Sequence, residues 1–315
     1  MQLSVNLKKE NKPLDGVINI YKEKGFTSHD VVAVVRKTIN QKKVGHTGTL
    51  DPDAEGVLPI CLGKGTKLAD YIMSDKKGYR AEVTLGITTT TEDSSGEILE
   101  VKPVDFNEEK IKEAVYSFIG EYDQVPPMYS AIKVNGKKLY ELAREGKEIE
   151  RKSRRIKIYD IKILEFLPPN KIVIDVICSK GTYIRTLCSD IGKKLGCGGN
   201  MSYLLRTMSG RFNIDTAIKL DELKTIVEKG SIDDILITID DVLCNYKKVK
   251  ILPKGTKLLH NGGKMYEYFF DGKYDLKKGE EVLVYDAEGT FIGIFQYNYD
   301  KSKEMYCVKP VKILL

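Results

Sequence analysis

One glycine-rich stretch, residues 42–67, limits the possible structures of this chain more than any other feature. It reads KKVGHTGTLDPDAEGVLPICLGKGTK and contains five glycines, two prolines and one of the three histidines in the chain. No amphipathic period runs through its first half, so we expect an irregular loop that presents side chains rather than a packed element. Catalytic residues are concentrated in loops that a rigid scaffold holds, and the rest of the fold should supply that scaffold.

Three familiar loop motifs do not fit this stretch. A phosphate-binding loop needs Ser or Thr after its Gly-Lys pair, but Gly65 follows Lys64, and Leu58 occupies the position of the first glycine. A calcium loop that began at Asp51 would need an acidic residue at its twelfth position, which is Leu62. The histidine of the stretch has no Cys or His neighbour at zinc-ligand spacing. A glycine-rich surface turn without function remains the alternative.

The composition is that of an ordinary globular protein. The 315 residues are 42% hydrophobic and 30% charged, which suits one large domain and a small one. No apolar run approaches the ~20 residues that span a bilayer, and the polar N-terminus has no signal-peptide core. The six cysteines form no CxxC pair. Reduced thiols of this kind are typical of a cytoplasmic protein, and no membrane association is expected.

Periodicity predicts the elements around the glycine-rich stretch. A strand at 15–20 should lead into a helix that Thr27 or Ser28 caps, and a second helix is expected over 107–119. Residues 171–178 alternate as a strand does, and helical spacing follows after a short turn. Arg185 should therefore lie in the first turn of a helix, where its guanidinium and the helix dipole both favour a nearby carboxylate.

Basic residues are concentrated in residues 124–158. This segment has ten Lys and Arg against four Glu, a balance of +6 that equals the net charge of the whole chain. Tyrosines are interleaved with these charges, as is typical of a surface that binds nucleic acid. A solvated charged face is the alternative. From about residue 246, short alternating strands separated by turn signals predict a small barrel.

Several strings together resemble the signature of the TruB-type pseudouridine synthases. They are GHTGTLDP with the following G-x-L-P-I-C-x-G, the K-x-Y-R string at 77–80, the PP-x-YSA-x-K pattern from 126, GTYIRT at 181–186 and MSYLLRTMSG at 201–210. The resemblance covers essentially the whole chain. It implies an isomerase that converts uridine to pseudouridine at position 55 in the tRNA T-loop, by base flipping, glycosidic bond cleavage and rejoining through carbon.

The same resemblance implies a fold of the α+β class. The catalytic domain would occupy 1–245, with a central mixed, mainly antiparallel sheet flanked by helices and loops. It would include an RNA-gripping thumb at about 124–158. A PUA-like RNA-binding β-barrel would occupy 246–315. The expected partner is the T-stem-loop of tRNA, without an obligate protein partner, and the protein is expected to be a monomer. An isomerisation needs no cofactor, and no metal site is expected.

The resemblance also implies roles for individual residues. Asp51 would be the catalytic carboxylate, Arg185 its ionic partner, and Tyr79 the ring that stacks on the uracil and assists loss of the C5 proton. Because a guanidinium favours the ionised acid, we expect the pKa of Asp51 to be lowered. His46 would fill the space that the flipped nucleotide leaves. Further contacts with the substrate or its RNA are expected from Tyr183, Leu204, Lys22, Lys133, Arg151, Arg154 and Arg155.

Two other functions are compatible with a basic protein of this kind. An RNA methyltransferase would need a glycine-rich nucleotide loop between a strand and a helix, and no convincing one is present. A non-catalytic tRNA-binding or chaperone protein would open the tRNA elbow without changing the base.

Overall fold

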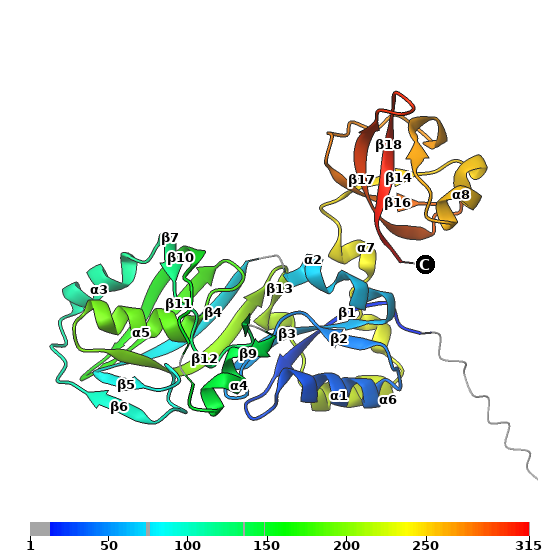
Figure 1. Cartoon of the computed structure of the whole chain (residues 1–315). Coiled ribbons are helices and arrows are strands. Elements are labelled where there is room, and N and C mark those ends of the chain that lie inside the picture. The colour runs from blue at the N-terminus through cyan, green and yellow to red at the C-terminus, as the bar shows by residue number, and fades with distance from the viewer. Residues whose placement is uncertain (1–12, 74–75, 135, 148, 315) are drawn as a thin grey trace, which may run out of the picture.

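The chain forms a broad sheet covered by helices and a smaller C-terminal sheet domain (Figure 1). This computed structural model describes residues 13–73, 76–134, 136–147 and 149–314. Among the helices of these residues, none is both long and apolar enough to cross a membrane. The fold class is α+β, as expected.

The central sheet is mixed and mainly antiparallel, which confirms the prediction. Its main path runs β1-β3-β12-β4-β11-β10-β7, and within this described path only β3 and β12 pair in parallel. Short β2 and β13 pair with β3 and β12. The strands are β1 (Gly16–Lys22), β2 (Val44–His46), β3 (Glu55–Leu62), β4 (Lys77–Leu85), β7 (Gly120–Gln124), β10 (Arg154–Leu167), β11 (Lys171–Cys178), β12 (Gly199–Ser209) and β13 (Phe212–Asn213).

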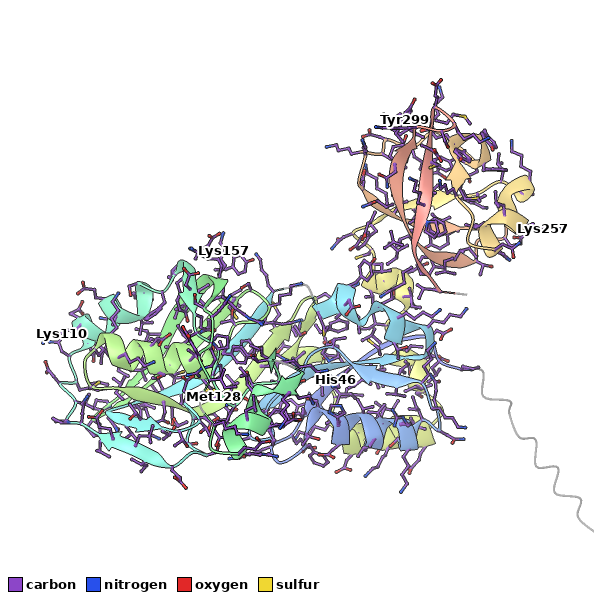
Figure 2. All side chains as sticks on the ribbon, in the orientation of Figure 1. His46, Lys110, Met128, Lys157, Lys257 and Tyr299 are labelled. Carbon is purple, nitrogen blue, oxygen red and sulfur yellow. The ribbon has the colours of Figure 1, made fainter. Side chains whose placement is uncertain are left out.

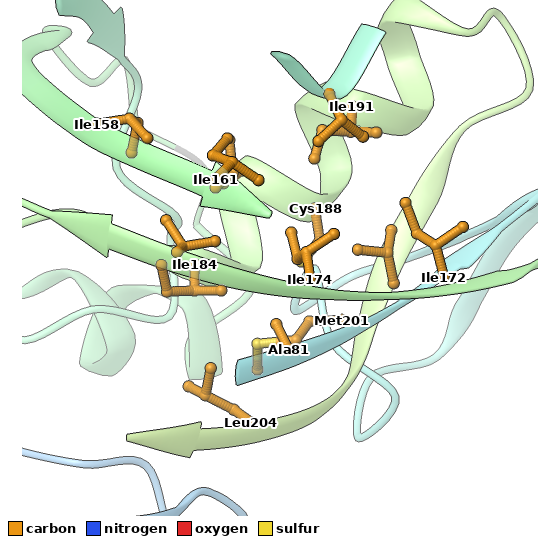
Figure 3. Close-up of a cluster of buried hydrophobic side chains, with 14 of the residues drawn as sticks. Ala81, Ile158, Ile161, Ile172, Ile174, Ile184, Cys188, Ile191, Met201 and Leu204 are labelled. Carbon is orange, nitrogen blue, oxygen red and sulfur yellow. The ribbon is translucent and has the colours of Figure 1, made fainter. Parts of the chain in front are cut away.

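Helices cover the two ends of this sheet and form separate hydrophobic cores. At the β1–β3 end, α1 (Ser28–Thr38) and α6 (Leu220–Glu228) pack on the strands. Over β4, β11 and β10, α5 (Ile184–Lys194) and α3 (Glu108–Tyr116) close the second core, part of which Figure 3 shows. Thr27 caps α1 in a full capping box with Asp30, as the sequence predicts. Asn107 caps α3, but that helix ends three residues before the expected boundary.

The glycine-rich stretch is only partly an irregular loop. Residues 44–46 and 55–62 are strands, so the irregular part is the short connection between β2 and β3. β3 lies between β1 and β12 and is buried along nearly its whole length. A strand that is covered on both faces shows no alternation of apolar and polar residues, and periodicity therefore does not reveal it.

A long insertion joins two neighbouring strands. β7 and β10 pair antiparallel, with Arg154 opposite Gln124, so residues 125–153 form the connection between them. We call this the β7–β10 segment. The expected thumb boundary at 158 lies inside β10, because residues 154–158 belong to the central sheet. The segment contains the hairpin of β8 (Lys133–Val134) and β9 (Lys137–Lys138), followed by α4 (Leu139–Arg144).

The second sheet is built from the C-terminal part of the chain and curls around its own core. Its strand order is β14-β16-β17-β18-β15. Figure 2 shows Lys257 and Tyr299 on the outside of this domain. Its elements are β14 (Lys247–Lys250), α8 (Thr256–His260), β15 (Met265–Tyr266), β16 (Glu281–Tyr285), β17 (Phe291–Asp300) and β18 (Met305–Ile313).

A shared apolar cluster joins the two sheets. Leu68, from the turn before α2 (Ala69–Met73), packs with Leu283 and Leu314 of the C-terminal domain and with residues near α7 (Ile239–Val242). Two lysines reinforce this contact: Lys67 donates to the Ile313 carbonyl at 2.9 Å, and Lys312 donates to the Lys67 carbonyl at 2.6 Å. Among the described residues, β5 (Ile87–Thr89) and β6 (Ile98–Val101) form a separate two-stranded sheet that lies beside the second core.

Candidate active site

Asp51 lies in the connection between β2 and β3 and forms an ion pair with Arg185. The Arg185 Nε and Asp51 Oδ2 atoms are 3.2 Å apart, so the pairing that the resemblance implies is present. Arg185 is the second residue of α5, as expected from the strand–turn–helix pattern. The Asp51 side chain is 44% exposed, whereas that of Arg185 is 8% exposed. The carboxylate is therefore accessible to a large molecule, and its guanidinium partner is not.

Arg185 makes a network of contacts that fixes its orientation. Its NH1 group lies 3.3 Å from the Asp93 carboxylate and donates to the Thr91 carbonyl at the same distance. Its NH2 group donates to the Tyr129 carbonyl at 2.9 Å. Asp93 in turn accepts hydrogen bonds from Thr91, Ser95 and the Ser95 backbone. A planar guanidinium held on several sides presents its Nε–H to Asp51 in one geometry.

The pKa of Asp51 is raised, which corrects the expectation of a lowered value. Desolvation by the surrounding protein is the main cause, and the charge of Asp93 acts in the same direction. Arg185 and Lys22 oppose these effects without outweighing them. The resemblance indicates the arginine partner, but the sequence indicates neither the desolvation of the carboxylate by the surrounding protein nor the second acid beside it.

Lys22 lies inside the protein and cannot contact RNA directly, contrary to the expectation. It is fully buried, and its ammonium donates to the carbonyls of Phe26 at 2.6 Å, Pro52 at 3.1 Å and Glu23 at 3.2 Å. Burial lowers its pKa to about 8. Because Pro52 follows Asp51, Lys22 ties the end of β1 to the connection that carries the carboxylate.

The start of α1 also holds this connection. The Leu50 backbone donates to the Ser28 hydroxyl at 2.9 Å, and the Gly25 backbone donates to the Pro52 carbonyl at 2.9 Å. These contacts bracket Asp51 on both sides. An irregular segment is therefore restrained by an adjacent strand end and a helix N-terminus, in addition to its own hydrogen bond from the Ala54 backbone to the Asp51 carbonyl at 3.1 Å.

Tyr79 and Arg206 face each other across two strands of the sheet. Their Cα atoms are paired in the register of β4 and β12, so both side chains point to the same face. Burial raises the pKa of the Tyr79 phenol, while the Arg206 guanidinium lowers it through its charge and a hydrogen-bonding contact. Arg206 is 2% exposed, and its Nε donates to the Val57 carbonyl at 2.6 Å.

Gly56 allows the strand that follows Asp51 to approach Arg206. Its φ is +104°, and a Cβ atom at this position would lie 2.3 Å from the Arg206 carbonyl oxygen. Substitution would thus require both a strained backbone and a displaced strand.

His46 ends β2 and lies beside the N-terminal turn of α1. Its ring makes an edge contact with His29, with centroids 5.3 Å apart, and its Nδ1 atom is buried without a hydrogen-bond partner in the described chain. Burial lowers the pKa of His46, and the nearby His29 and Arg206 act in the same direction. The ring is therefore neutral at pH 7, as suits an aromatic surface that stacks on a base.

Two further expected contact residues lie on the elements around this site. Tyr183 is the residue before α5, and both its backbone groups are hydrogen-bonded to the Gln124 side chain. Leu204 is on β12, two residues before Arg206 and opposite Ala81 in register. It is 7% exposed and packs into the second core, as Figure 3 shows.

The expected RNA-contacting cations lie in or beside the β7–β10 segment. Lys133 and Arg154 are exposed. Arg155 is also exposed but forms an ion pair with Asp123 on the neighbouring strand, with 3.0 Å between Nε and Oδ1. Arg151 is half-buried and donates to the Pro126 carbonyl at 3.1 Å. Lys133 and Arg154 therefore face solvent, whereas Arg151 partly anchors the segment.

Sequence reasoning missed three groups at this site: Asp93, the Tyr129 carbonyl and Arg206. Asp93 lies in a polar turn whose sequence, TEDSSG, is typical of any surface hairpin. The Tyr129 carbonyl carries no sequence signal because it is a backbone group. Arg206 is part of the MSYLLRTMSG string, and its position in that string could have identified it as a candidate site residue.

Comparisons with known proteins show which families and relatives this chain resembles. A model of the TruB family pseudouridylate synthase N-terminal domain matches residues 36–184, and a model of the tRNA pseudouridylate synthase B C-terminal domain matches 185–244. The tRNA pseudouridine synthase B of Alkaliphilus oremlandii is 50% identical over 96% of this chain and 99% of its own length. That of Clostridioides difficile is 48% identical over 96% of this chain and 100% of its own length.

The chain also resembles solved structures, at lower sequence identity. The chain is similar to one in the crystal structure of a Cbf5-Nop10-Gar1 complex, with a TM-score of 0.72 and 28% identity. The similarity covers 96% of this chain and 85% of that one. Asp51, Tyr79 and Arg185 lie within or at the edge of residues that the two family models match.

Proposed function

This chain belongs to the TruB family of pseudouridylate synthases and makes pseudouridine 55 in the T-loop of tRNA, and we propose that it does so with Asp51 as the reacting carboxylate. The observation that carries the proposal is the ion pair between Asp51 and Arg185, in which an accessible acid meets a buried guanidinium. The methyltransferase and the non-catalytic alternatives do not agree with this family membership.

Asp51 acts on the ribose of the target nucleotide. Its carboxylate either adds to C1′ as a nucleophile or removes a sugar proton, and both routes break the N1–C1′ bond. Both also need the ionised acid, and Arg185 stabilises that form through its Nε–H. The four contacts of Arg185 hold the carboxylate in one orientation, which limits the reorganisation that the reaction requires.

Tyr79 and His46 contribute to base flipping at two places, one at the extruded uracil and one at the position in the T-loop that the nucleotide leaves. Extrusion of a stacked uridine costs on the order of a few kcal/mol, which contacts with the protein must offset. Tyr79 provides a ring against the extruded uracil. His46 provides a neutral ring that takes the place of the nucleotide in the T-loop. Tyr183 and Leu204 line the site of the target base.

The RNA is held by surfaces outside the reacting centre. We assign 1–245 to the catalytic domain and 246–315 to a PUA-like RNA-binding domain. The β7–β10 segment and the start of β10 grip the T-stem-loop through Lys133, Arg154 and the neighbouring cations. The protein acts as a monomer in the cytoplasm, where its tRNA substrate is present, and needs no protein partner.

Tritium release from [5-³H]uridine tRNA tests the role of Asp51, because the new C5–C1′ bond replaces the C5–H bond. Asp51→Asn should lower the rate of release by at least about 10⁴-fold, since the variant lacks an ionisable carboxylate. Binding of tRNA should be retained. The matched control is Asp53→Asn, which changes an exposed acid of the same connection and should release tritium at the normal rate. Undiminished release by Asp51→Asn contradicts the proposal.

A further inference from the structure

Arg206 is a buried cation whose bonding is incomplete. It is 2% exposed, and its Nε donates to the Val57 carbonyl at 2.6 Å. Its NH2 group is buried without a hydrogen-bond partner in the described chain. No carboxylate of the described residues lies within ion-pair distance of the guanidinium. Buried charges are normally paired, because an unpaired one loses its hydration without compensation.

Packing alone does not account for an arginine at this position. Its neighbours on the same face of β12 and β4 include Leu204 and Ala81, which belong to the second core. A methionine or leucine could fill such a site without the cost of desolvating a charge. The residue paired with Arg206 in register is Tyr79, which carries the phenol expected to meet the uracil. Arg206 and Tyr79 therefore lie side by side on one face of the sheet, and the guanidinium interacts with the phenol through its charge and a hydrogen-bonding contact.

We propose that Arg206 is a positioning residue that holds the Tyr79 hydroxyl and stabilises negative charge on its oxygen while that oxygen takes the proton from C5. This inference rests on the proposed placement of the uracil against Tyr79. It gives a function to a buried positive charge that takes no part in the contacts between Asp51 and Arg185.

The step is balanced without any further reactant. When C5 has bonded to C1′, it still carries its hydrogen, and N1 is joined to C6 by a double bond. Tyr79, as the phenolate, accepts the C5 proton as the C5–H bond breaks and becomes the neutral phenol. The electron pair of that bond forms the C5=C6 double bond, and the electrons of the former N1=C6 bond go to N1. The proton taken from C5 exchanges with solvent and a solvent proton adds to N1, so the base is restored and one proton has moved in net from C5 to N1. Burial raises the pKa of Tyr79 and disfavours the phenolate, whereas the charge of Arg206 beside it opposes that rise and favours the form that accepts the proton.

The test is a kinetic isotope effect on single-turnover pseudouridine formation. Substrate tRNA with protium or deuterium at C5 of the target uridine is compared in the wild type, Arg206→Gln and Arg206→Lys. Arg206→Gln should lower the rate constant by about 10²-fold, a loss typical of weakened proton transfer. Its isotope effect should rise clearly above that of the wild type, because C5–H cleavage becomes the slow step. Arg206→Lys keeps a cation without the planar fork and should fall between the two.

Two comparisons separate this role from a merely structural one. In the Tyr79→Phe background, Arg206→Gln should have no further effect on the rate constant, because Arg206 acts through the phenol. Arg211→Gln, at an exposed arginine on the turn after β12, is the matched control and should leave both quantities unchanged.

A slowed variant with an unchanged isotope effect would overturn the proposal, as would additive losses in the double variant. If Arg206→Gln does not fold, the isotope effect of Arg206→Lys decides the question. Failure of the proposed function is seen separately, because it would leave tritium release intact in Asp51→Asn.

Discussion

The surroundings of Asp51 and the β7–β10 segment differ in how firmly their charged groups are held. Near Asp51, Arg185 is 7% exposed and contacts four different groups, and Lys22 is fully buried among three carbonyls. In the β7–β10 segment, Lys133 and Lys152 are exposed, and α4 has only six residues. The first region is a short connection held by a strand end and a helix N-terminus, and the second is a long connection between two strands.

This difference assigns separate tasks to the two regions. Chemistry at a single carbon requires a fixed geometry, which strand register and buried hydrogen bonds provide. Attraction to a phosphate backbone requires charge at the surface and tolerates variation in side-chain position. Changes near Asp51 should therefore alter the rate constant at saturating tRNA, whereas changes in the β7–β10 segment should alter affinity.

The pH dependence of the rate constant provides the largest expected effect among the tests of this comparison. Burial and Asp93 raise the pKa of Asp51, and the reaction needs the ionised carboxylate. Activity should therefore be present above that raised pKa and fall about tenfold for each pH unit below it. Asp93→Asn removes a like charge, so the acid limb of the profile should move to lower pH. Single-turnover rates between about pH 4 and 8 measure this shift.

Asp105→Asn is the control for that experiment, because Asp105 forms an exposed pair with Lys110 near the start of α3. Its profile should match that of the wild type. An acid limb that stays in place in Asp93→Asn would show that Asp93 does not act on the carboxylate.

Charge reversal at the end of the β7–β10 segment and the start of β10 should have a smaller effect, on binding only. Replacing Arg151, Lys152, Arg154 and Arg155 by Glu should weaken tRNA binding and flatten the dependence of affinity on salt. The slope should fall by about one unit for each phosphate that is no longer neutralised. The rate constant at saturating tRNA should change little. Filter binding at several salt concentrations measures the affinity and its slope. Lys224→Glu with Lys229→Glu, near the end of α6, is the matched control.

An unchanged salt slope in the reversed variant would show that the segment is only a solvated charged face. The single reversals should differ as well. Arg154 faces solvent, so its reversal should cost affinity alone, whereas Arg151 also anchors the segment through the Pro126 carbonyl.

The smallest expected effect concerns the ion pair between Arg155 and Asp123. Both side chains are more than half exposed, so Asp123→Asn should change the free energy of unfolding by less than about 1 kcal/mol. It also releases Arg155 from a competing carboxylate, and tRNA affinity should rise slightly at low salt. Chemical denaturation and filter binding give the two values. A clear drop in affinity would show that the pair orients Arg155 for RNA.

The sequence predicts those parts of the site that carry local signals. Thr27 as a cap, Arg185 in the first turn of a helix and the strand at 171–178 all follow from periodicity and residue type, and the structure confirms them. The pairing of Asp51 with Arg185 follows from the resemblance alone, because nothing in the spacing of two residues so far apart brings them together.

Features that depend on strand register could not be predicted. The contact between Tyr79 and Arg206 requires β4 to pair with β12 in one alignment, and a shift of one residue would turn either side chain to the other face. The burial of Lys22 depends on the positions of three carbonyls from two separate connections. The direction of the Asp51 pKa shift could not be predicted either, because desolvation by the surrounding protein outweighs the charge of the adjacent arginine.

The hydrogen bond from Arg185 to the Tyr129 carbonyl connects the β7–β10 segment to the catalytic acid. Tyr129 lies at the foot of the β7–β10 segment, and the same guanidinium contacts Asp51. Any swing of that foot which breaks this bond leaves an arginine N–H without its acceptor. The position of this backbone carbonyl and the orientation of the catalytic acid are thus linked through one planar group.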